Sequence, residues 1–465
     1  MAIDSINPAT EEVIASFEEH SPKQIDEALD RSIAAFRAWR ETSFAHRAGL
    51  MHAAARELRR DASRLAGLIT AEMGKPLPQS RAEVEKCALC CEYFADNAEA
   101  FLADIPKPSA ASESYVAFDP LGPVLAIMPW NFPLWQVFRF AAPSLMAGNV
   151  GVLKHASNVP QCALAIENVF TQAGFPVGAF QTLLVPGAKA MSLVEDARIA
   201  AVTLTGSEEA GSRVAEASGR SLKRTVLELG GSDPYIVLDD ADLEAAARIA
   251  IDARFQNAGQ SCIAAKRFIV TESVADEFEA RFRNGIEELS VGDPSEASVR
   301  IGPLAKGDLV DTLEQQVEAS VKQGAQIVTG GHRLERRGYF YAPTLISAVK
   351  RGMPVFTEET FGPAAALIRV SDADEAIETA NDSRFGLGAN LWTRDIDRAK
   401  QLARRIESGS VFINGMVASD PRLPFGGVKR SGYGRELSDF GIREFVNIKT
   451  VWIGPVQTSA PPKSE

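Results

Sequence analysis

The chain has 465 residues, of which 46% are hydrophobic and 24% charged, and its formal net charge is −12. This composition is typical of a soluble globular protein of about three domains, and without a Lys/Arg cluster it argues against nucleic-acid binding. The N-terminus does not have the basic region followed by an apolar run that is typical of a signal peptide, and no apolar run reaches the roughly 18 residues of a membrane span. We therefore expect cytoplasmic residence by default.

The first hundred residues have mostly helical spacing. Ser21–Gln24 combines a capping-box pattern with proline at the first helical position, and an apolar stripe at helical spacing follows it. Residues 103–122 are rich in Pro, Ser and Ala and end in a possible short strand. We interpret them as a domain boundary or as an excursion out of the first unit.

The cysteines favour core packing over metal binding or disulfides. They are Cys87, Cys90, Cys91, Cys162 and Cys262. An odd number in a cytoplasmic chain argues against a disulfide framework, and Cys87-x-x-Cys90 has neither a second CxxC nor a nearby His pair to complete a zinc site. Cys87 and Cys91 instead share one helical stripe with apolar residues, so we expect no metal.

Strands alternate with helices from residue 123 onward. Apolar runs at 123–129, 149–156, 180–187, 199–206 and 225–231 are each separated by helical spacing. This alternation predicts a parallel, doubly wound α/β sheet, which binds ligands at the carboxyl ends of its strands. A second alternating region runs from about 234 to 415, and residues 443–454 have the composition of a strand that could form an arm with 103–122.

Four short stretches could carry chemistry, and each has a simpler alternative. Gly206-Ser207 opens a helix after a strand, which suits a phosphate or an ordinary turn. Asn131, between two prolines, could donate to an oxyanion or cap a helix. Glu228 ends a buried strand, where burying a carboxylate is costly, so the residue has either a functional role or an ion-pair partner. Cys262 follows Gly-Gln-Ser, a polar setting that favours a reactive thiol, but the five His residues offer it no Cys-His-Asn pattern.

Together these stretches resemble the aldehyde dehydrogenase superfamily. The matching pieces, in family order over nearly the whole chain, are PWNFP (129–133), GNVGVLKHAS (148–157), LTGS (204–207), LELGGSDP (227–234), NAGQSC (257–262), EETFGP (358–363), FINGM (412–416) and PFGGVKRSGYGRE (424–436). The resemblance implies two doubly wound Rossmann-type α/β domains plus a small β arm. It implies a cofactor-binding domain at 1–107 and 123–229, a catalytic domain at 230–428, and an oligomerisation arm and tail at 108–122 and 429–465.

The resemblance also assigns roles to individual residues. Cys262 matches the nucleophile that forms a thiohemiacetal and then a thioester, Asn131 the oxyanion donor, and Glu228 the base that activates water for hydrolysis. The cofactor positions are Trp130, Lys154, Ser157, Gly206, Ser207, Glu359 and Phe361. Many relatives carry Glu where this chain has Ser157, and a carboxylate there would repel a 2′-phosphate. We therefore expect NADP, with NAD as the alternative.

The substrate positions are most similar to those of bacterial succinate-semialdehyde dehydrogenases. Arg139 and Ser419 match residues that hold an ω-carboxylate, and Gln260 joins them as a candidate substrate contact. Some relatives have an arginine where this chain has Gln256, so half of a two-arginine clamp is missing or comes from elsewhere. The alternative for Arg139 is a surface helix charge.

Three other functions remain open at this point. The chain could oxidise another aldehyde, such as glutarate semialdehyde or an aromatic aldehyde. It could be a catalytically silent cofactor-binding or structural protein, against which the intact set of Cys262, Glu228 and Asn131 argues. It could form an acyl-CoA, although the retained Glu228 favours water as the acyl acceptor. We expect a homodimer or homotetramer.

Overall fold

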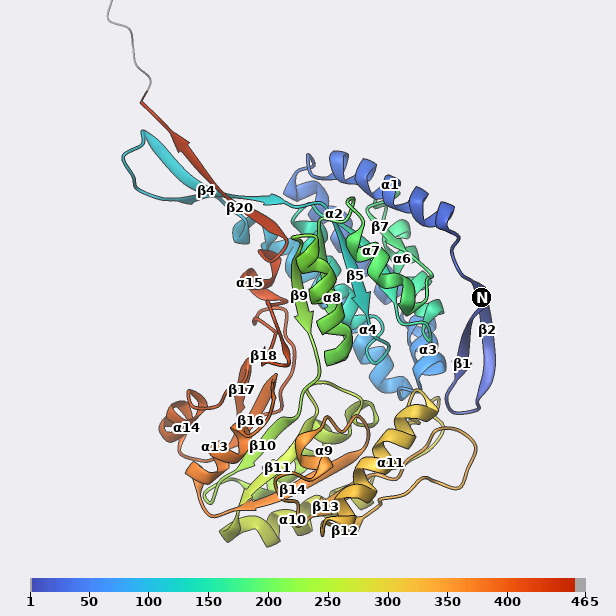
Figure 1. Cartoon of the computed structure of the whole chain (residues 1–465), viewed down its shortest axis with the longest axis vertical. Coiled ribbons are helices and arrows are strands. Elements are labelled where there is room, and N and C mark those ends of the chain that lie inside the picture. Colours follow the sequence, from blue (N-terminus) through green and yellow to red (C-terminus); the bar gives the residue numbers. More distant parts are fainter. Residues whose placement is uncertain (1, 456–465) are drawn as a thin grey trace, which may run out of the picture.

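Two sheets of mainly parallel strands, each packed with helices, build most of the protein, and a narrow β arm projects from one of them (Figure 1). The structure is a computed structural model that describes residues 2–455. The predicted α/β architecture with two doubly wound sheets is confirmed. Residues 456–465 of the predicted tail lie outside the described part.

The first sheet has the strand order β19-β9-β8-β5-β6-β7. Its strands are β5 (Pro123–Met128), β6 (Val150–His155), β7 (Phe180–Thr182), β8 (Ala201–Thr205), β9 (Arg224–Glu228) and β19 (Gly432–Tyr433). All pairs are parallel except β9 with β19. Because the chain crosses from β7 back past β5 to β8, the order reverses beside β5, and such a reversal is where doubly wound sheets bind ligands.

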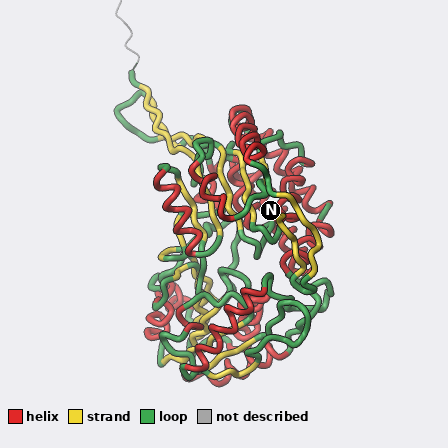
Figure 2. Tube along the Cα trace, turned by 45° about the vertical axis from the view of Figure 1, so that its right-hand side comes forward, coloured by secondary structure: helices red, strands yellow, loops and turns green. Residues whose placement is uncertain are grey.

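Helices cover both faces of this sheet (Figure 2). They are α1 (Pro22–Trp39), α2 (Phe44–Arg60), α3 (Ala62–Met73), α4 (Leu77–Phe101), α5 (Trp135–Met146), α6 (Pro160–Gln172), α7 (Ala190–Glu195) and α8 (Glu208–Arg220), with the short turn η1 (Gly187–Lys189) before α7. Alternation along β5 serves both faces: Val124 and Ala126 pack with α5, whereas Leu125 packs with α1 and α8. This double burial explains the continuous apolar runs of the sequence.

The second sheet has the order β12-β13-β14-β11-β10-β16-β17. Its strands are β10 (Asp233–Val237), β11 (Ala265–Thr271), β12 (Gln326–Thr329), β13 (Thr344–Ser347), β14 (Ala364–Val370), β16 (Gly388–Trp392) and β17 (Ser410–Ile413). Its helical segments are α9 (Leu243–Phe255), η2 (Gln256–Gly259), α10 (Glu272–Glu287), α11 (Gly307–Lys322), α12 (Pro354–Thr357), α13 (Ala373–Asn381) and α14 (Ile396–Ala403). Only β12 runs antiparallel to its neighbour, and a separate apolar core surrounds the sheet.

A third set of strands makes the arm at the upper left of Figure 1. It contains β3 (Ile105–Pro106), β4 (Glu113–Pro120) and β20 (Val446–Ile453), and β20 pairs with β4 along its whole length. A short pair, β15 (Phe385–Gly386) with β18 (Val428–Lys429), and helix α15 (Ser438–Ile442) connect the second sheet to the arm. The domain boundaries given above remain a prediction.

The helical prediction for the first hundred residues missed a hairpin. Strands β1 (Ala2–Asn7) and β2 (Glu12–Glu18) pair antiparallel before α1 begins. The hairpin is held from outside its own sequence, because Ser5 is fully buried and its hydroxyl donates to Glu72 of α3 at 2.7 Å.

The helix that carries three of the cysteines packs as expected. Val84, Cys87, Cys91 and Phe94 are all fully buried on α4, and every cysteine of the described chain is free. No group of residues with metal-ligand spacing occurs among residues 2–455. Within the same range, every helix is too short or too polar to cross a membrane.

Candidate active site

The carboxyl ends of neighbouring strands in the first sheet carry several of the predicted site residues. Trp130 and Asn131 follow β5, Gly206 and Ser207 follow β8, and Glu228 is the last residue of β9. Because parallel strands end at the same edge, these side chains converge there although about a hundred residues separate the first from the last in sequence.

Cys262 lies at this edge on a loop that precedes a strand of the second sheet, and the backbone of this loop is strained. The loop connects η2 to β11, and it begins with Asn257, Ala258 and Gly259, whose φ angles are 54°, 53° and 73°. Left-handed conformations cost non-glycine residues of order 1–3 kcal/mol each, so the surrounding structure must hold them. Lys266 contributes by donating to the carbonyls of Ser261 at 2.9 Å and Cys262 at 2.8 Å.

Hydrogen bonds join the Cys262 loop to Asn131. The Asn257 amide donates to the Asn131 carbonyl at 2.8 Å, and the Asn131 amide donates to the Gln260 carbonyl at 3.0 Å. Gln136 donates to Asn131 Oδ1 at 3.2 Å, which fixes the orientation of the Asn131 amide. One N–H of that amide is therefore left for a ligand in the cavity that Asn131 lines.

Two glycines let the loop approach the end of β9. A Cβ at Gly231 would lie 2.6 Å from the carbonyl oxygen of Cys262, and one at Gly230 would lie 2.4 Å from a carboxyl oxygen of Glu359. Both distances are shorter than real contacts. The Gly-Gly that follows Glu228 and Leu229 thus has a steric cause, because any side chain there would displace Cys262 or Glu359.

Glu228 is buried with an unusually free carboxyl group. The residue is 1% exposed, and neither carboxyl oxygen has a hydrogen-bond partner among the described residues. Burial, and then the charge of Glu436, raises the pKa of Glu228 well above its ordinary value, while Arg139 opposes the rise. A carboxyl group with free oxygens and a raised pKa is a stronger proton acceptor than an ordinary carboxylate, which suits a general base.

Two cavities meet at Cys262. One, of about 250 Å³, is lined by the residues that follow β5, β8 and β9, and by Glu359 and Phe361. The other, of about 190 Å³, lies between α4, α5 and the loop that carries Ser419. Cys262 and Gln136 line both. A thiol at such a junction can contact one ligand from each side.

The Cys262 thiol is accessible but poorly solvated. Its side chain is only partly exposed, and it lines both cavities. Burial raises the pKa of Cys262 to about 12, although Arg139 and Lys266 lower it. Since the thiolate is the nucleophile, the thiol must pass its proton to an acceptor when it reacts.

The larger cavity has features that fit a dinucleotide. Ser207 caps the 13-residue helix α8, whose N-terminus favours a phosphate, and Gly206 beside it leaves the backbone open. Trp130 and Phe361 line the same cavity, with ring centroids 5.8 Å apart. Glu359 also lines it and accepts from the backbone N–H of Gly231 at 3.0 Å.

Lys154 and Ser157 lie at the carboxyl end of β6, the strand next to β5, and neither is among the residues that line the cavity. Lys154 is 7% exposed, and no carboxylate of residues 2–455 pairs with it. Burial, and then Lys306, lowers the pKa of Lys154. Ser157 is exposed in the turn that follows. A buried cation without a counter-ion and a hydroxyl donor at the end of the same strand together suit a phosphate group.

The smaller cavity brings Arg139, Ser419 and Gln256 together with Cys262. Arg139 is 2% exposed on α5, where its guanidinium pairs with Glu436 and lies 4.5 Å from the centroid of the Phe425 ring. It is therefore not a surface helix charge. Gln256 is exposed at the start of η2 and adds an amide where the resemblance allowed an arginine.

Gln260 requires a correction. Its side chain is fully buried and lines neither cavity, because its amide donates to the Asn257 carbonyl at 3.1 Å and accepts from the Ala305 N–H at 2.9 Å. The residue shapes the loop, so we do not carry the expected substrate contact forward.

The sequence reasoning overlooked Lys86, Asn257 and Glu436. Lys86 lies on the same helix as the buried cysteines, and nothing in its local pattern signals a cavity. Asn257 and Glu436 stand inside the quoted NAGQSC and PFGGVKRSGYGRE pieces, and their contacts with Asn131 and Arg139 become visible only in three dimensions.

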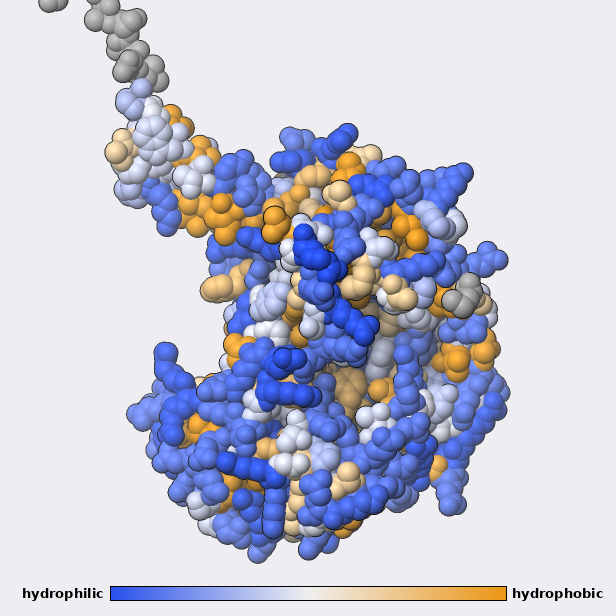
Figure 3. Space-filling view, in the orientation of Figure 1, coloured by the Kyte–Doolittle hydropathy of each residue, from blue (hydrophilic) through white to orange (hydrophobic). Residues whose placement is uncertain are grey.

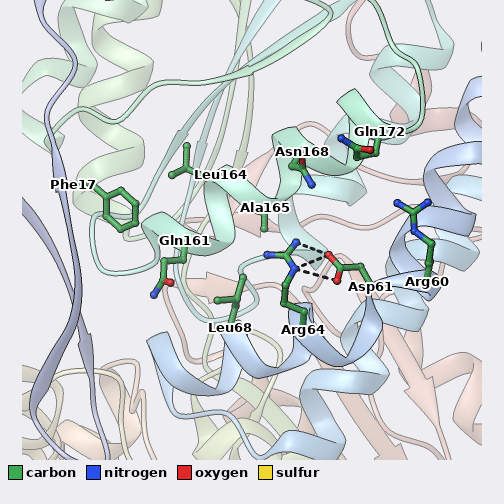
Figure 4. A pocket seen from close by; sticks show the side chains of 10 residues that line it. All are labelled: Phe17, Arg60, Asp61, Arg64, Leu68, Gln161, Leu164, Ala165, Asn168 and Gln172. Atoms are coloured by element: carbon green, nitrogen blue, oxygen red, sulfur yellow. Dashed lines mark hydrogen bonds and ion pairs between the residues drawn. The ribbon is translucent and has the colours of Figure 1, made fainter.

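A larger cavity elsewhere contains none of the predicted residues. It measures about 500 Å³ and is lined by residues of α2, α3 and α6 (Figure 4). There Arg64 donates to Asp61 at 2.8 Å, and both side chains lie on the helix surface. Cavity size alone therefore does not identify the site, whereas the convergence on Cys262 does.

Comparisons with known proteins agree with this geometry. Residues 1–451 match the aldehyde dehydrogenase family. A Mycobacterium bovis protein named succinate-semialdehyde dehydrogenase [NADP(+)] 1 is 52% identical over 456 residues, covering 97% of this chain and 100% of that protein. A Paenarthrobacter nicotinovorans protein named aldehyde dehydrogenase is also 52% identical over 456 residues, again with 97% and 100% coverage.

A solved structure gives a similar result. The crystal structure of succinic semialdehyde dehydrogenase from Streptococcus pyogenes, in complex with NADP+ as the cofactor, has a TM-score of 0.95 to this chain at 36% sequence identity. The match covers 97% of this chain and 100% of that chain.

Proposed function

The chain belongs to the aldehyde dehydrogenase family, and from this premise we propose that it oxidises succinate semialdehyde to succinate with NADP as the hydride acceptor. The observation that carries the proposal is the place of Cys262, between a cavity with phosphate-binding features and a second cavity lined by Lys86, Arg139 and Ser419. The names of the relatives support the same substrate and cofactor.

The first chemical step needs a nucleophile and an oxyanion donor. The Cys262 thiol gives its proton to water, and the thiolate attacks the aldehyde carbon to form a thiohemiacetal, whose oxygen is stabilised by the free N–H of the Asn131 amide and by the Cys262 backbone N–H. The hydrogen bonds from Asn257 and Gln136 hold Asn131 in place for this task. A nicotinamide cofactor held by Trp130, Gly206, Ser207, Glu359 and Phe361 supplies a hydride acceptor when bound.

The second step needs a base. Once the substrate carbon is oxidised to a thioester, Glu228 takes a proton from water, and the water oxygen replaces the sulfur of Cys262 at the acyl carbon. The carboxylic acid leaves, and the thiol is regenerated. The free carboxyl oxygens and raised pKa of Glu228 support this role.

Asn131→Ala is expected to lower kcat/KM for the aldehyde by about 10²–10³-fold, the usual cost of removing one oxyanion donor. Steady-state absorbance of the reduced cofactor measures it. Asn168→Ala, on the exposed face of α6 at the separate cavity, is the matched control and should leave the rate unchanged. An Asn131→Ala enzyme that is folded and as fast as the wild type would exclude this role.

The cofactor preference is proposed to depend on Ser157 and Lys154. Ser157→Glu is expected to lower kcat/KM for NADP by roughly 10²-fold relative to NAD, because a carboxylate there repels a 2′-phosphate. Ser157→Gln adds the same bulk without charge and should retain most of the preference. Steady-state rates with both cofactors measure the ratio. If Ser157→Glu still preferred NADP as the wild type does, the phosphate would have to bind elsewhere.

The experiment that tests the whole proposal is a matrix of aldehydes against both cofactors. Succinate semialdehyde, glutarate semialdehyde, an aromatic aldehyde and butanal are compared for the wild type and Cys262→Ala. The proposal expects the highest kcat/KM with succinate semialdehyde and NADP. A higher kcat/KM with another aldehyde would show that this other aldehyde is the preferred substrate. If neither cofactor were reduced with any aldehyde, the result would favour a catalytically silent protein.

Assembly and location complete the proposal. The β20 side chains Ile448, Trp452 and Ile453 are 56%, 56% and 42% exposed, and hydrophobic residues gather on the arm in Figure 3. Single exposed apolar residues are ordinary, but a group on a projecting strand favours contact with another subunit. We propose a homodimer or homotetramer that works in the cytoplasm.

A further inference from the structure

Lys86 occupies an unusual place in the smaller cavity. It lies on α4, partly buried, and lines the cavity together with Cys262. Its Nζ donates to Ser419 Oγ at 2.8 Å and lies 4.2 Å from the centroid of the Trp135 ring. The ammonium group is thus held by contacts from α5 and from the loop that carries Ser419.

The groups around Ser419 offer donors to a ligand. Ser419 Oγ accepts from Lys86 Nζ and, at 2.9 Å, from Trp135 Nε1. A hydroxyl has two acceptor sites and one donor, so both acceptor sites are used and its O–H is left to donate. Lys86 has three N–H groups, of which one is engaged with Ser419. An ammonium and a hydroxyl with free donors form a site for a carboxylate.

Lys86 is the cation of the cavity whose charge is not balanced by an ion pair among the described residues, because the other charged side chains that line the cavity have partners. Arg139 pairs with Glu436, and Glu83 pairs with Lys75 while accepting two backbone N–H groups. Among residues 2–455, no carboxylate forms an ion pair with Lys86.

We infer that Lys86 selects for aldehydes with an ω-carboxylate: its ammonium and the Ser419 hydroxyl bind the carboxylate while the aldehyde reaches Cys262. The inference rests on the proposed function and deepens it. It also accounts for Gln256, because α4 supplies the positive charge that some relatives place at that position. Arg139 contributes its donors, but its net charge is balanced by Glu436.

The surroundings of Lys86 make this selection depend on pH. Burial, and then the charge of Arg139, lowers the pKa of Lys86 to about 8. The charged or titratable groups that face it are Glu83, Cys87 and Cys90 of α4, Arg139 of α5 and Asp420 next to Ser419. The pKa values of both thiols are raised by burial, so they stay neutral in this range. Asp420 is held by Arg422.

The selection weakens as pH rises. Below about pH 8 Lys86 is a cation and attracts the carboxylate, whereas above about pH 8 it loses its proton and with it the attraction. Values of kcat/KM report groups of the free enzyme. The ratio of kcat/KM for succinate semialdehyde to that for butanal removes the shared titration of Cys262 and Glu228. In the wild type this ratio is expected to fall as pH rises through about 8.

Variants test the same ratio at neutral pH. Lys86→Met keeps the length of the side chain without charge, and it is expected to lower kcat/KM for succinate semialdehyde about 10- to 100-fold while changing that for butanal much less. Arg81→Met, exposed on the same helix, makes the same change in net charge and should leave both values unaltered. Lys86→Arg should retain the preference and abolish its fall at high pH.

The outcomes separate the inference from the function on which it rests. A wild type without preference for succinate semialdehyde overturns both. A wild type with a preference that Lys86→Met retains overturns only the role of Lys86, as does an equal loss with both aldehydes. If Lys86 acted only by holding Ser419 in place, Ser419→Ala would remove the fall of the kcat/KM ratio at high pH. The inference instead expects the Ser419→Ala enzyme to retain that fall, because Lys86 binds the carboxylate itself. The wild-type pH profile needs no variant to fold.

Discussion

Replacing Cys262 with alanine is expected to lower kcat by about 10⁵–10⁶-fold, the scale seen when an essential nucleophile is removed from an enzyme. Both chemical steps pass through this sulfur, and no other cysteine can replace it. Cys87, Cys90, Cys91 and Cys162 are fully buried, and burial raises the pKa of each thiol. The rate of cofactor reduction with succinate semialdehyde measures the effect.

The matched control for this variant is Cys91→Ala. It removes a buried thiol on α4 and should lower the melting temperature while leaving kcat nearly unchanged. Cofactor titration by fluorescence should show that Cys262→Ala still binds NADP, since the variant removes no phosphate contact. Wild-type turnover by a folded Cys262→Ala enzyme would disprove covalent catalysis at this residue.

Glu228→Gln is expected to separate the two steps. Steady-state turnover should fall about 10²–10⁴-fold, the usual contribution of a general base, while the first turnover still yields a rapid burst of reduced cofactor. Rapid mixing with succinate semialdehyde and NADP measures both phases. Glu85→Gln, which removes an exposed carboxylate that pairs with Arg59, is the control and should alter neither phase.

If Glu228→Gln lost the burst as well as the steady-state turnover, Glu228 would be the base that accepts the proton of the Cys262 thiol as well as the proton of the water. This alternative is physically reasonable, because burial holds the pKa of Cys262 near 12 and the thiol needs an acceptor. With the raised pKa of Glu228, the hydrolysis rate of the wild type should increase with pH as the carboxyl group ionises. Glu228→Gln should lack that increase.

The main architecture could be predicted because parallel strands buried on both faces leave continuous apolar runs. Strands β5, β6 and β8 lie where those runs occur. The β1–β2 hairpin could not be predicted in this way, because few of its residues are buried and its contact with Glu72 joins residues 67 positions apart.

The candidate site was predictable only in part. Family motifs place Cys262, Asn131 and Glu228, but they do not show that Asn257 takes a left-handed conformation and bonds to Asn131. Lys86 carries no local signal, since its partner Ser419 lies 333 residues away in sequence. The roles of such residues depend on contacts between segments that are distant in sequence, and these contacts become visible only in the folded structure.

The central claim is that Cys262 holds the acyl group between hydride loss and hydrolysis. The most direct measurement is peptide mass spectrometry of Glu228→Gln enzyme, quenched with acid after reaction with succinate semialdehyde and NADP. We expect one succinyl group per chain, attached to the peptide that contains Cys262 and removed by hydroxylamine, as a thioester requires. Cofactor reduction with no adduct on that peptide, or an adduct on another cysteine, would contradict the mechanism.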